Sequence, residues 1–274
     1  SANTTGSGNL AIGYGAYDNA DTEGNNLAIG RDALGGSING GETNIAIGNY
    51  SLDANTSGDR NVALGYVALT QNSTGTYNVA IGSGASQLNS SGSSNTSLGN
   101  NSMYSNTSAN YNTAIGAEAL YDIARTSDTD GYNTALGYNA GNTGTNDITT
   151  GNKNTLLGAS TAASAAAGTN QTIIGYGASG VANNSVTIGN SDVTAWYPGA
   201  DNTADLGSSS VEFKDLYIDG TANLDAVDID GGAIDGAAIG ANSASTGAFT
   251  TITASTSLDV TGSTGIILEN DETI

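Results

Sequence analysis

The stretch Asn112-Thr113-Ala114-Ile115-Gly116 decides the fold, because near-copies of it recur eleven times between residues 9 and 189. The glycines that close the copies are 14 to 21 residues apart, and the commonest spacing is 17. They are Gly13, Gly30, Gly48, Gly65, Gly82, Gly99, Gly116, Gly137, Gly158, Gly175 and Gly189. A period of this length is typical of a solenoid, in which each repeat buries its apolar residues only against its neighbours.

Each copy is predicted to contain a short strand that ends just before the glycine. The residues one and three positions before the glycine are aliphatic or Thr, and most copies have Ala between them, as in Val62-Ala63-Leu64. Alternate residues of a strand point to opposite faces, so the two larger side chains share one face. We expect the larger face to fill the interior of the roll and the Ala face to pack against another chain.

A second apolar pair, small then larger, follows the glycine corner, for example Ala68-Leu69 and Ala119-Leu120. A polar turn then leads into the next copy and usually contains its own glycine, such as Gly75. One repeat is therefore predicted to comprise two short strands and two turns.

An Asn stands four positions before the glycine in the first nine copies. These residues are Asn9, Asn26, Asn44, Asn61, Asn78, Asn95, Asn112, Asn133 and Asn154. Two roles fit this column: a stacked ladder of side chains, or a turn residue whose side chain bonds its own backbone. The glycine is predicted to mark a tight corner where a side chain would clash. We predict that both columns are structural and bind no ligand.

The composition argues against several classes of function. The 274 residues include 26 acidic and 5 basic residues, a formal net charge of −21 that disfavours binding to nucleic acid or anionic membranes. The chain has no Cys and no His, which excludes disulfides, thiolate metal sites and histidine-based catalysis. No apolar run reaches the length of a membrane span, so no membrane insertion is expected. We also expect no cofactor and no enzymatic activity.

The repeat pattern divides the chain into three parts: repeats over residues 1–190, an aromatic cap and connector over 191–222, and a fibre shaft over 223–274. The second part contains the only Trp of the chain, and Trp196 and Tyr197 are expected to cap the last coil. A sugar-binding platform for receptor contact is the alternative. The third part is too poor in hydrophobic residues to fold alone, so identical chains are expected to wind around each other.

Two further features of the sequence have open interpretations. Two copies are stretched by insertions at residues 122–130 and 142–149, which we expect to emerge as surface loops, as neutral decoration rather than binding loops. The third part carries Asp225, Asp228, Asp230 and Asp235, the residue type that Ca²⁺ prefers. Their spacing matches no calcium loop, which favours solvated turn carboxylates.

The stretch Asn112-Thr113-Ala114-Ile115-Gly116-Ala117-Glu118-Ala119-Leu120 resembles the head repeat of YadA-type trimeric autotransporter adhesins. The longer repeat with Asn72-Ser73-Thr74-Gly75 also resembles the repeats of phage tail fibres. The resemblance covers about 190 of the 274 residues. It implies a left-handed parallel β-roll in which three chains pack side by side, followed by a connector and a thin intertwined β shaft.

Two later stretches favour the tail fibres. Residues 204–221, from Ala204-Asp205-Leu206-Gly207 to Gly220-Thr221, are similar to a segment common in phage tail fibre and tail spike proteins. In those proteins this segment often precedes a C-terminal chaperone that trimerises the fibre and then cleaves itself away. Residues 231–252 also look like fibre shaft. An autotransporter is expected to show a heptad stalk and a membrane anchor, and neither pattern is visible in this sequence.

The resemblance implies a structural and adhesive function: a homotrimeric tail fibre segment of the virion that contacts other tail or baseplate proteins and a host cell-surface glycan or protein. The alternative is the head of a trimeric adhesin on a bacterial cell surface. A third hypothesis is a polysaccharide depolymerase that works with paired carboxylates. The acidic residues of the repeats lie in variable turn positions rather than as a pair on adjacent coils, which disfavours the enzyme.

Overall fold

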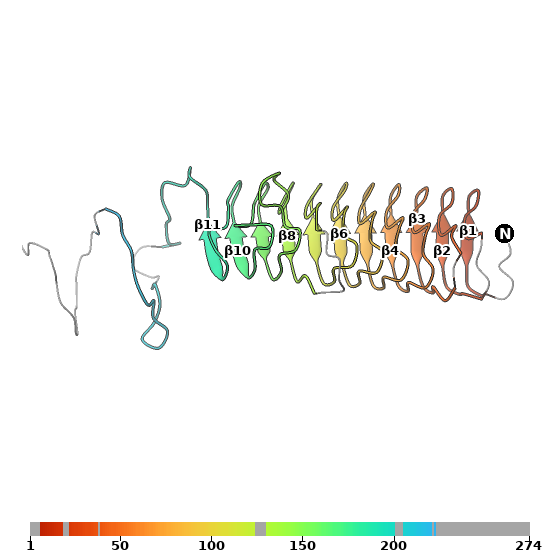
Figure 1. Ribbon diagram of the computed structural model, residues 1–274, viewed down its shortest axis with the longest axis horizontal. Coiled ribbons are helices and arrows are strands. Elements are labelled where there is room, and N and C mark those ends of the chain that lie inside the picture. Colours follow the sequence, from red (N-terminus) through yellow and green to blue (C-terminus); the bar gives the residue numbers. More distant parts are fainter. Residues whose placement is uncertain are drawn as a thin grey trace, which may run out of the picture. The chain divides into compact units, whose positions relative to one another are not determined.

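The computed structural model of the chain describes residues 6–18, 22–37, 39–123, 130–200, 205–220 and 222. The chain divides into two compact units, residues 1–204 and residues 205–274, and each is described by itself. The first unit is a stack of coils, where a coil is one copy of the sequence repeat (Figure 1). Each coil contributes one strand to a single sheet.

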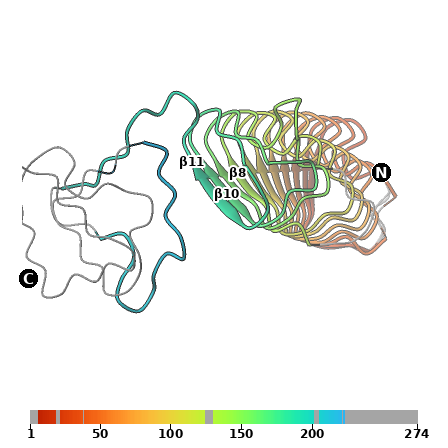
Figure 2. The same cartoon turned by 60° about the vertical axis from the view of Figure 1, so that its left-hand side comes forward.

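Among the described residues, eleven short strands form this sheet, and each pairs in parallel with the next strand in sequence order. The strands are β1 (Leu10–Ile12), β2 (Leu27–Ile29), β3 (Ile45–Ile47), β4 (Val62–Leu64), β5 (Val79–Ile81), β6 (Thr96–Leu98), β7 (Thr113–Ile115), β8 (Thr134–Leu136), β9 (Thr155–Leu157), β10 (Gln171–Ile174) and β11 (Ser185–Ile188). They lie on one side of the roll (Figure 2). Equivalent residues are paired, as Ala63 with Ala80. The predicted all-β parallel solenoid is confirmed.

The prediction of a second strand in each repeat is wrong. In the described coils the second apolar pair lies in consecutive turns, where Val67 and Leu69 have φ angles of 51° and 50°. Left-handed residues cost roughly 1–3 kcal/mol each unless the surroundings hold them. Here stacking holds them, because the N–H of Val67 donates to the Asn49 carbonyl and that of Leu69 to the Ala85 carbonyl, both at 3.0 Å. These bonds reach the preceding and the following coil.

The expected assignment of the two strand faces is also wrong, because the Ala face points inward. Ala63 in the middle of β4 is fully buried, whereas its neighbour Leu64 is 42% exposed. The same alternation holds in β3, β6, β8 and β9, where the middle residue is buried and the flanking residues are less buried or exposed. The Ile, Leu, Val and Thr columns that we expected inside therefore form the outer surface of the sheet.

The interior has room only for a small residue on the strand side because the opposite wall supplies the large one. Leu34, Leu52, Leu69, Met103 and Leu120 come from the second apolar pair, and all are fully buried. They belong to the same core clusters as the strand alanines. Close packing leaves no space for large side chains on both walls of so narrow a roll.

Where the inward side chain on one wall of the roll becomes smaller, the inward side chain on the other wall becomes larger. Gly141 stands at the position of the buried Leu column, and the middle residue of the following strand β9 is Leu156 instead of Ala. A Cβ added at Gly141 would lie 2.8 Å from Leu120 Cδ2 and 3.5 Å from Ile148 Cδ1, so the space is already filled. Ile148 comes from the insertion at 142–149 and is fully buried. This insertion therefore supplies a core residue and is more than surface decoration.

A polar pair shows the same coupling between the walls. Ser86 replaces the buried Leu in its coil, and Ser97 replaces the Ala of the next strand, β6. The Ser86 hydroxyl donates a hydrogen bond to the Ser97 hydroxyl at 2.9 Å, and both side chains are buried. Each hydroxyl therefore satisfies the other, which removes most of the penalty for burying it.

Candidate interaction surfaces

The recurring Asn residues form a ladder along the inside of the roll. Asn61 is representative: its Nδ2 donates to the Gly75 carbonyl at 2.9 Å, and its Oδ1 accepts the N–H of Asn78 in the next coil at 2.9 Å. In all nine coils the Asn Oδ1 accepts the N–H of the first residue of the next copy, up to Gln171. Because these polar atoms are used within the stack, the column holds successive coils together.

The glycines that close the strands form a second internal column. The first nine, Gly13 to Gly158, have φ angles between 133° and 143°, which an L side chain rarely adopts. A Cβ on Gly65 would also lie 2.5 Å from the carbonyl oxygen of Gly82 in the next coil. Glycine is therefore needed both for the corner and for the close approach of successive coils.

The structure contains a second Asn ladder, which we did not predict from the sequence. It consists of Asn55, Asn72, Asn89 and Asn106. The Nδ2 of Asn72 donates to the Oδ1 of Asn55 at 3.1 Å and to the Gly75 carbonyl at 3.0 Å. The signal was present as an Asn-x-x-Gly turn with the 17-residue spacing of the main repeat, beginning at Asn55, Asn72 and Asn89.

The outward-pointing residues of the sheet form a surface that we name the strand face: the residues one and three positions before each closing glycine. Its large exposed members are Leu10, Ile12, Ile45, Leu64, Leu98, Leu136, Leu157, Val186 and Ile188. From β6 to β10 the column three before the glycine is Thr, beginning with Thr96. Paired strands hold these residues in register, so they form continuous columns and are not scattered single side chains.

A cluster of aromatic rings and one cation lies at the corners that follow β1 to β4. We name Tyr14, Arg31, Tyr50 and Tyr66 the Tyr–Arg cluster. The Arg31 Cζ lies 5.8 Å from the ring centroid of Tyr14 and 5.7 Å from that of Tyr50. The rings of Tyr50 and Tyr66 meet edge to face with centroids 6.2 Å apart. A hollow of about 330 Å³ is lined by Tyr14 and Arg31.

Four other tyrosines form two stacked pairs. Tyr111 and Tyr132 stack with centroids 5.2 Å apart and an interplanar angle of 5°. Tyr104 and Tyr121 stack in the same way at 4.9 Å. Such pairs stabilise neighbouring coils through their ring faces, and each uses one face of each ring.

The predicted aromatic cap is not seen in the single chain. Trp196 and Tyr197 are 78% and 85% exposed, so neither ring covers the last coil, and residues 191–200 are exposed throughout. Val193 lies close to the end of the roll, since a Cβ on Gly189 would lie 2.6 Å from Val193 Cγ2. Receptor contact by Trp196 and Tyr197 stays a prediction.

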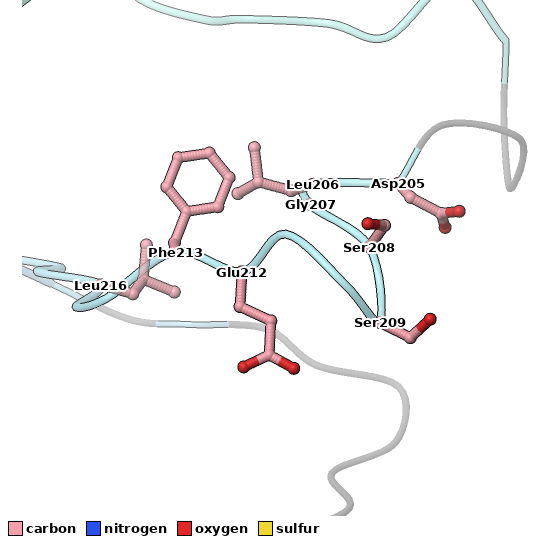
Figure 3. A pocket seen from close by; sticks show the side chains of 8 residues that line it. All are labelled: Asp205, Leu206, Gly207, Ser208, Ser209, Glu212, Phe213 and Leu216. Carbon is pink, nitrogen blue, oxygen red and sulfur yellow. The ribbon is translucent and has the colours of Figure 1, made fainter.

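In the second unit, the described residues from 205 onward form a turn with no buried residue. The Ser208 N–H donates to the Val211 carbonyl at 2.9 Å. A hollow of about 600 Å³ is lined by Asp205, Leu206, Gly207, Ser208, Ser209, Glu212, Phe213 and Leu216 (Figure 3). Its apolar members, Leu206, Phe213 and Leu216, are largely exposed to solvent.

Two aspartates among the described residues have raised pKa values. Burial, followed by the negative charge of Asp32, raises the pKa of Asp53, and burial followed by Asp147 raises the pKa of Asp122. The described residues contain no group of three or more side chains able to hold a metal ion. The aspartates proposed for Ca²⁺, Asp225 to Asp235, lie outside the described residues. Within the described ranges, no helix has the length and hydrophobicity to cross a bilayer.

The fold defines a β-solenoid repeat protein. Comparison with known proteins finds no family model that matches the chain and no curated protein with a significantly similar sequence.

Proposed function

We propose that this chain is a structural and adhesive segment of a phage tail fibre, which acts as a homotrimer in the virion and contributes to attachment to the host surface. The observation that supports this function best is the strand face, whose column of Ile and Leu one position before each glycine follows the whole eleven-stranded sheet and is half-buried or exposed in the single chain. The resemblance of the repeats and of residues 204–221 to tail fibre sequences supports the same function.

The strand face is large enough to hold chains together. Eleven strands spaced by about 4.8 Å make a surface about 48 Å long and two side-chain columns wide. Monomeric proteins rarely leave such continuous apolar surface in water, and its burial stabilises an assembly by roughly 25 cal/mol per Å². If identical chains associate in parallel and in register, each coil of one chain meets the same coil of the others. This is the arrangement of a closed symmetric oligomer. The number three comes from the family resemblance.

The second unit supports association independently of the roll. Its described residues include Leu206, Val211, Phe213, Leu216 and Ile218, all exposed. A segment without a buried residue has no core of its own, so identical segments are the natural cover for these side chains. Both units therefore favour association of identical chains.

A stacked roll suits a fibre because its length is set by the number of coils. Such a rod projects from a tail or baseplate and presents its outer corners to a cell-surface glycan or protein. The charge of −21 per chain makes the associated chains repel each other, so apolar burial has to outweigh this repulsion. We therefore expect the trimer to be more stable at higher salt concentration, where the charges are screened.

The decisive experiment measures the mass of the native assembly. The intact chain of 27.0 kDa is expected to give about 81 kDa, the mass of three copies. The double variant Leu64→Glu, Leu98→Glu places two charges on the strand face and is expected to release folded monomers. The matched control, Ser57→Glu with Thr74→Glu, adds the same charge at exposed turn residues and is expected to stay trimeric. A folded monomer of the unmodified chain would overturn the proposal.

The adhesin alternative predicts the same trimer, so location separates the two. Mass spectrometry of purified virions is expected to detect this chain if it is a tail fibre, and adsorption of virions to host cells is expected to fall when the purified trimer competes. Recovery from the bacterial surface in the absence of virions would favour the adhesin.

A further inference from the structure

The Tyr–Arg cluster combines an open tyrosine ring face with a neighbouring cation that the fold holds in place. Tyr14 is 80% exposed, and the side chain of Arg31 lies on the coil next to it. The stacked pairs such as Tyr111 and Tyr132 cover each other, whereas Tyr14 borders a hollow of about 330 Å³ that it shares with Arg31. This volume is at the lower end of small-molecule sites.

The polar groups of the cluster are held in place by the fold. The backbone N–H of Arg31 donates to the Oδ1 of Asn49 at 2.9 Å. The side-chain Nε of Arg31 donates to the Oδ2 of Asp32 at 3.1 Å. The guanidinium also lies between the rings of Tyr14 and Tyr50. Gly15 has a φ of 65°, and a Cβ there would collide with the Asp32 carboxylate, so glycine leaves room for this group.

The remaining donors point to a ligand rich in hydroxyl groups. The Nη atoms of Arg31 donate to no described residue, and its side chain is 60% exposed. Rigid aromatic faces beside a few fixed polar groups are what a flat, partly apolar ring with polar edges requires. The pyranose ring of a sugar has this shape and chemistry.

The local charges select between neutral and acidic sugars. The ion pair with Asp32 neutralises Arg31, and Asp53 adds a further carboxylate nearby, whose pKa is raised by burial and then by the negative charge of Asp32. The whole chain carries −21, so an added carboxylate or sulfate would meet net repulsion. A neutral sugar avoids this repulsion.

We infer that the Tyr–Arg cluster binds an uncharged hexose or N-acetylhexosamine unit of a surface glycan, which stacks on Tyr14 and exchanges hydrogen bonds with Arg31 and Asp32. The inference rests on the proposed attachment function and gives it a site and a ligand class. Tyr50 and Tyr66 continue the apolar surface over the next coils, where a following sugar unit would lie.

The test uses the intact chain on an array of immobilised oligosaccharides that contains neutral hexoses, N-acetylhexosamines, uronic acids and sialylated glycans. We expect binding to a neutral member, and a loss of about tenfold or more in affinity for Tyr14→Ala and Arg31→Gln. The control Tyr132→Ala removes an exposed tyrosine about 30 Å further along the stack and is expected to bind normally.

Each outcome decides the inference. Exclusive binding of acidic glycans, an equal loss in Tyr132→Ala, or no binding to any neutral member would overturn the site. The native mass of every variant is measured in parallel. A trimer that binds no neutral glycan would defeat this site and leave the fibre function standing, whereas a monomeric intact chain would defeat the fibre function itself.

Discussion

The roll and the connector after residue 204 both expose aliphatic side chains, but only the roll also buries them. In β4 the exposed Leu64 follows the fully buried Ala63, whereas every described residue from 205 to 220 is exposed. The roll therefore has a core within one chain. The described residues of the connector bury no apolar side chain in the single chain, and in the proposed trimer such burial would come from association.

The sharpest test of this difference uses two adjacent residues of one strand. Ala63→Arg places an unpaired charge and a large side chain in the filled interior, at an expected cost of more than about 4 kcal/mol. Leu64→Arg places the same group on the strand face, where it is solvated in the single chain. Circular dichroism at 25 °C is expected to show lost β structure for Ala63→Arg and a native spectrum for Leu64→Arg.

Equal spectra for these two variants would contradict the inward assignment of the alanines. The measurement is read together with the native mass, because Leu64→Arg is also expected to weaken association through the strand face. Loss of trimer with retained β structure is the pattern that separates the outer face from the core.

The Asn ladder allows a smaller and more local test of the roll. Asn78→Ala removes the bond from Nδ2 to the Gly92 carbonyl (2.8 Å) and leaves the buried N–H of Asn95 without its acceptor. We expect a loss of about 1–3 kcal/mol, measured by urea denaturation. The control Asn100→Ala removes an exposed amide and is expected to cost less than about 0.5 kcal/mol. Similar urea midpoints for the Asn78→Ala and Asn100→Ala variants would mean that the ladder contributes little to the stability of the roll.

The smallest effect on the roll is expected from changes in the connector. Phe213→Ser combined with Leu216→Ser removes two of its exposed apolar side chains. In the dissociated chain this double variant is expected to change the urea midpoint of the roll by less than the equivalent of about 0.5 kcal/mol. In the assembly it is expected to weaken association, measured as a lower native mass after dilution. A large change in the isolated chain would show that the connector supports the roll directly.

The sequence alone was sufficient to predict the repeat, the strand before each glycine and the corner at that glycine. The period predicted a solenoid, and the strands lie where the alternating pattern before each glycine placed them, from Leu10–Ile12 to Ser185–Ile188. Glycine was a reliable marker because only a residue without a side chain tolerates both its φ angle and the backbone of the next coil. These features depend on local sterics, which the residue type itself reveals.

The conformation of the second apolar pair could not be predicted from the sequence. Ala68-Leu69 is as apolar as a strand, but the structure makes it part of a chain of left-handed turns. Bonds to neighbouring coils stabilise that conformation, for example from the Leu69 N–H to the Ala85 carbonyl, and such partners are not visible in a single repeat. The burial of Ile148 could not be predicted for the same reason, because its position depends on the space that Gly141 leaves in the interior.

The sequence by itself determined which residues share a face of each strand, and only the tertiary structure decided which face is inside. An alternating pattern has period two whichever way the strand is turned, and both faces of Val62-Ala63-Leu64 are apolar, so hydrophobicity gave no preference. The decision came from volume: Leu69 and its equivalents project from the opposite wall, and a narrow roll has no space for a second large side chain facing them from the strand. The larger residues are left outside, where they form the strand face.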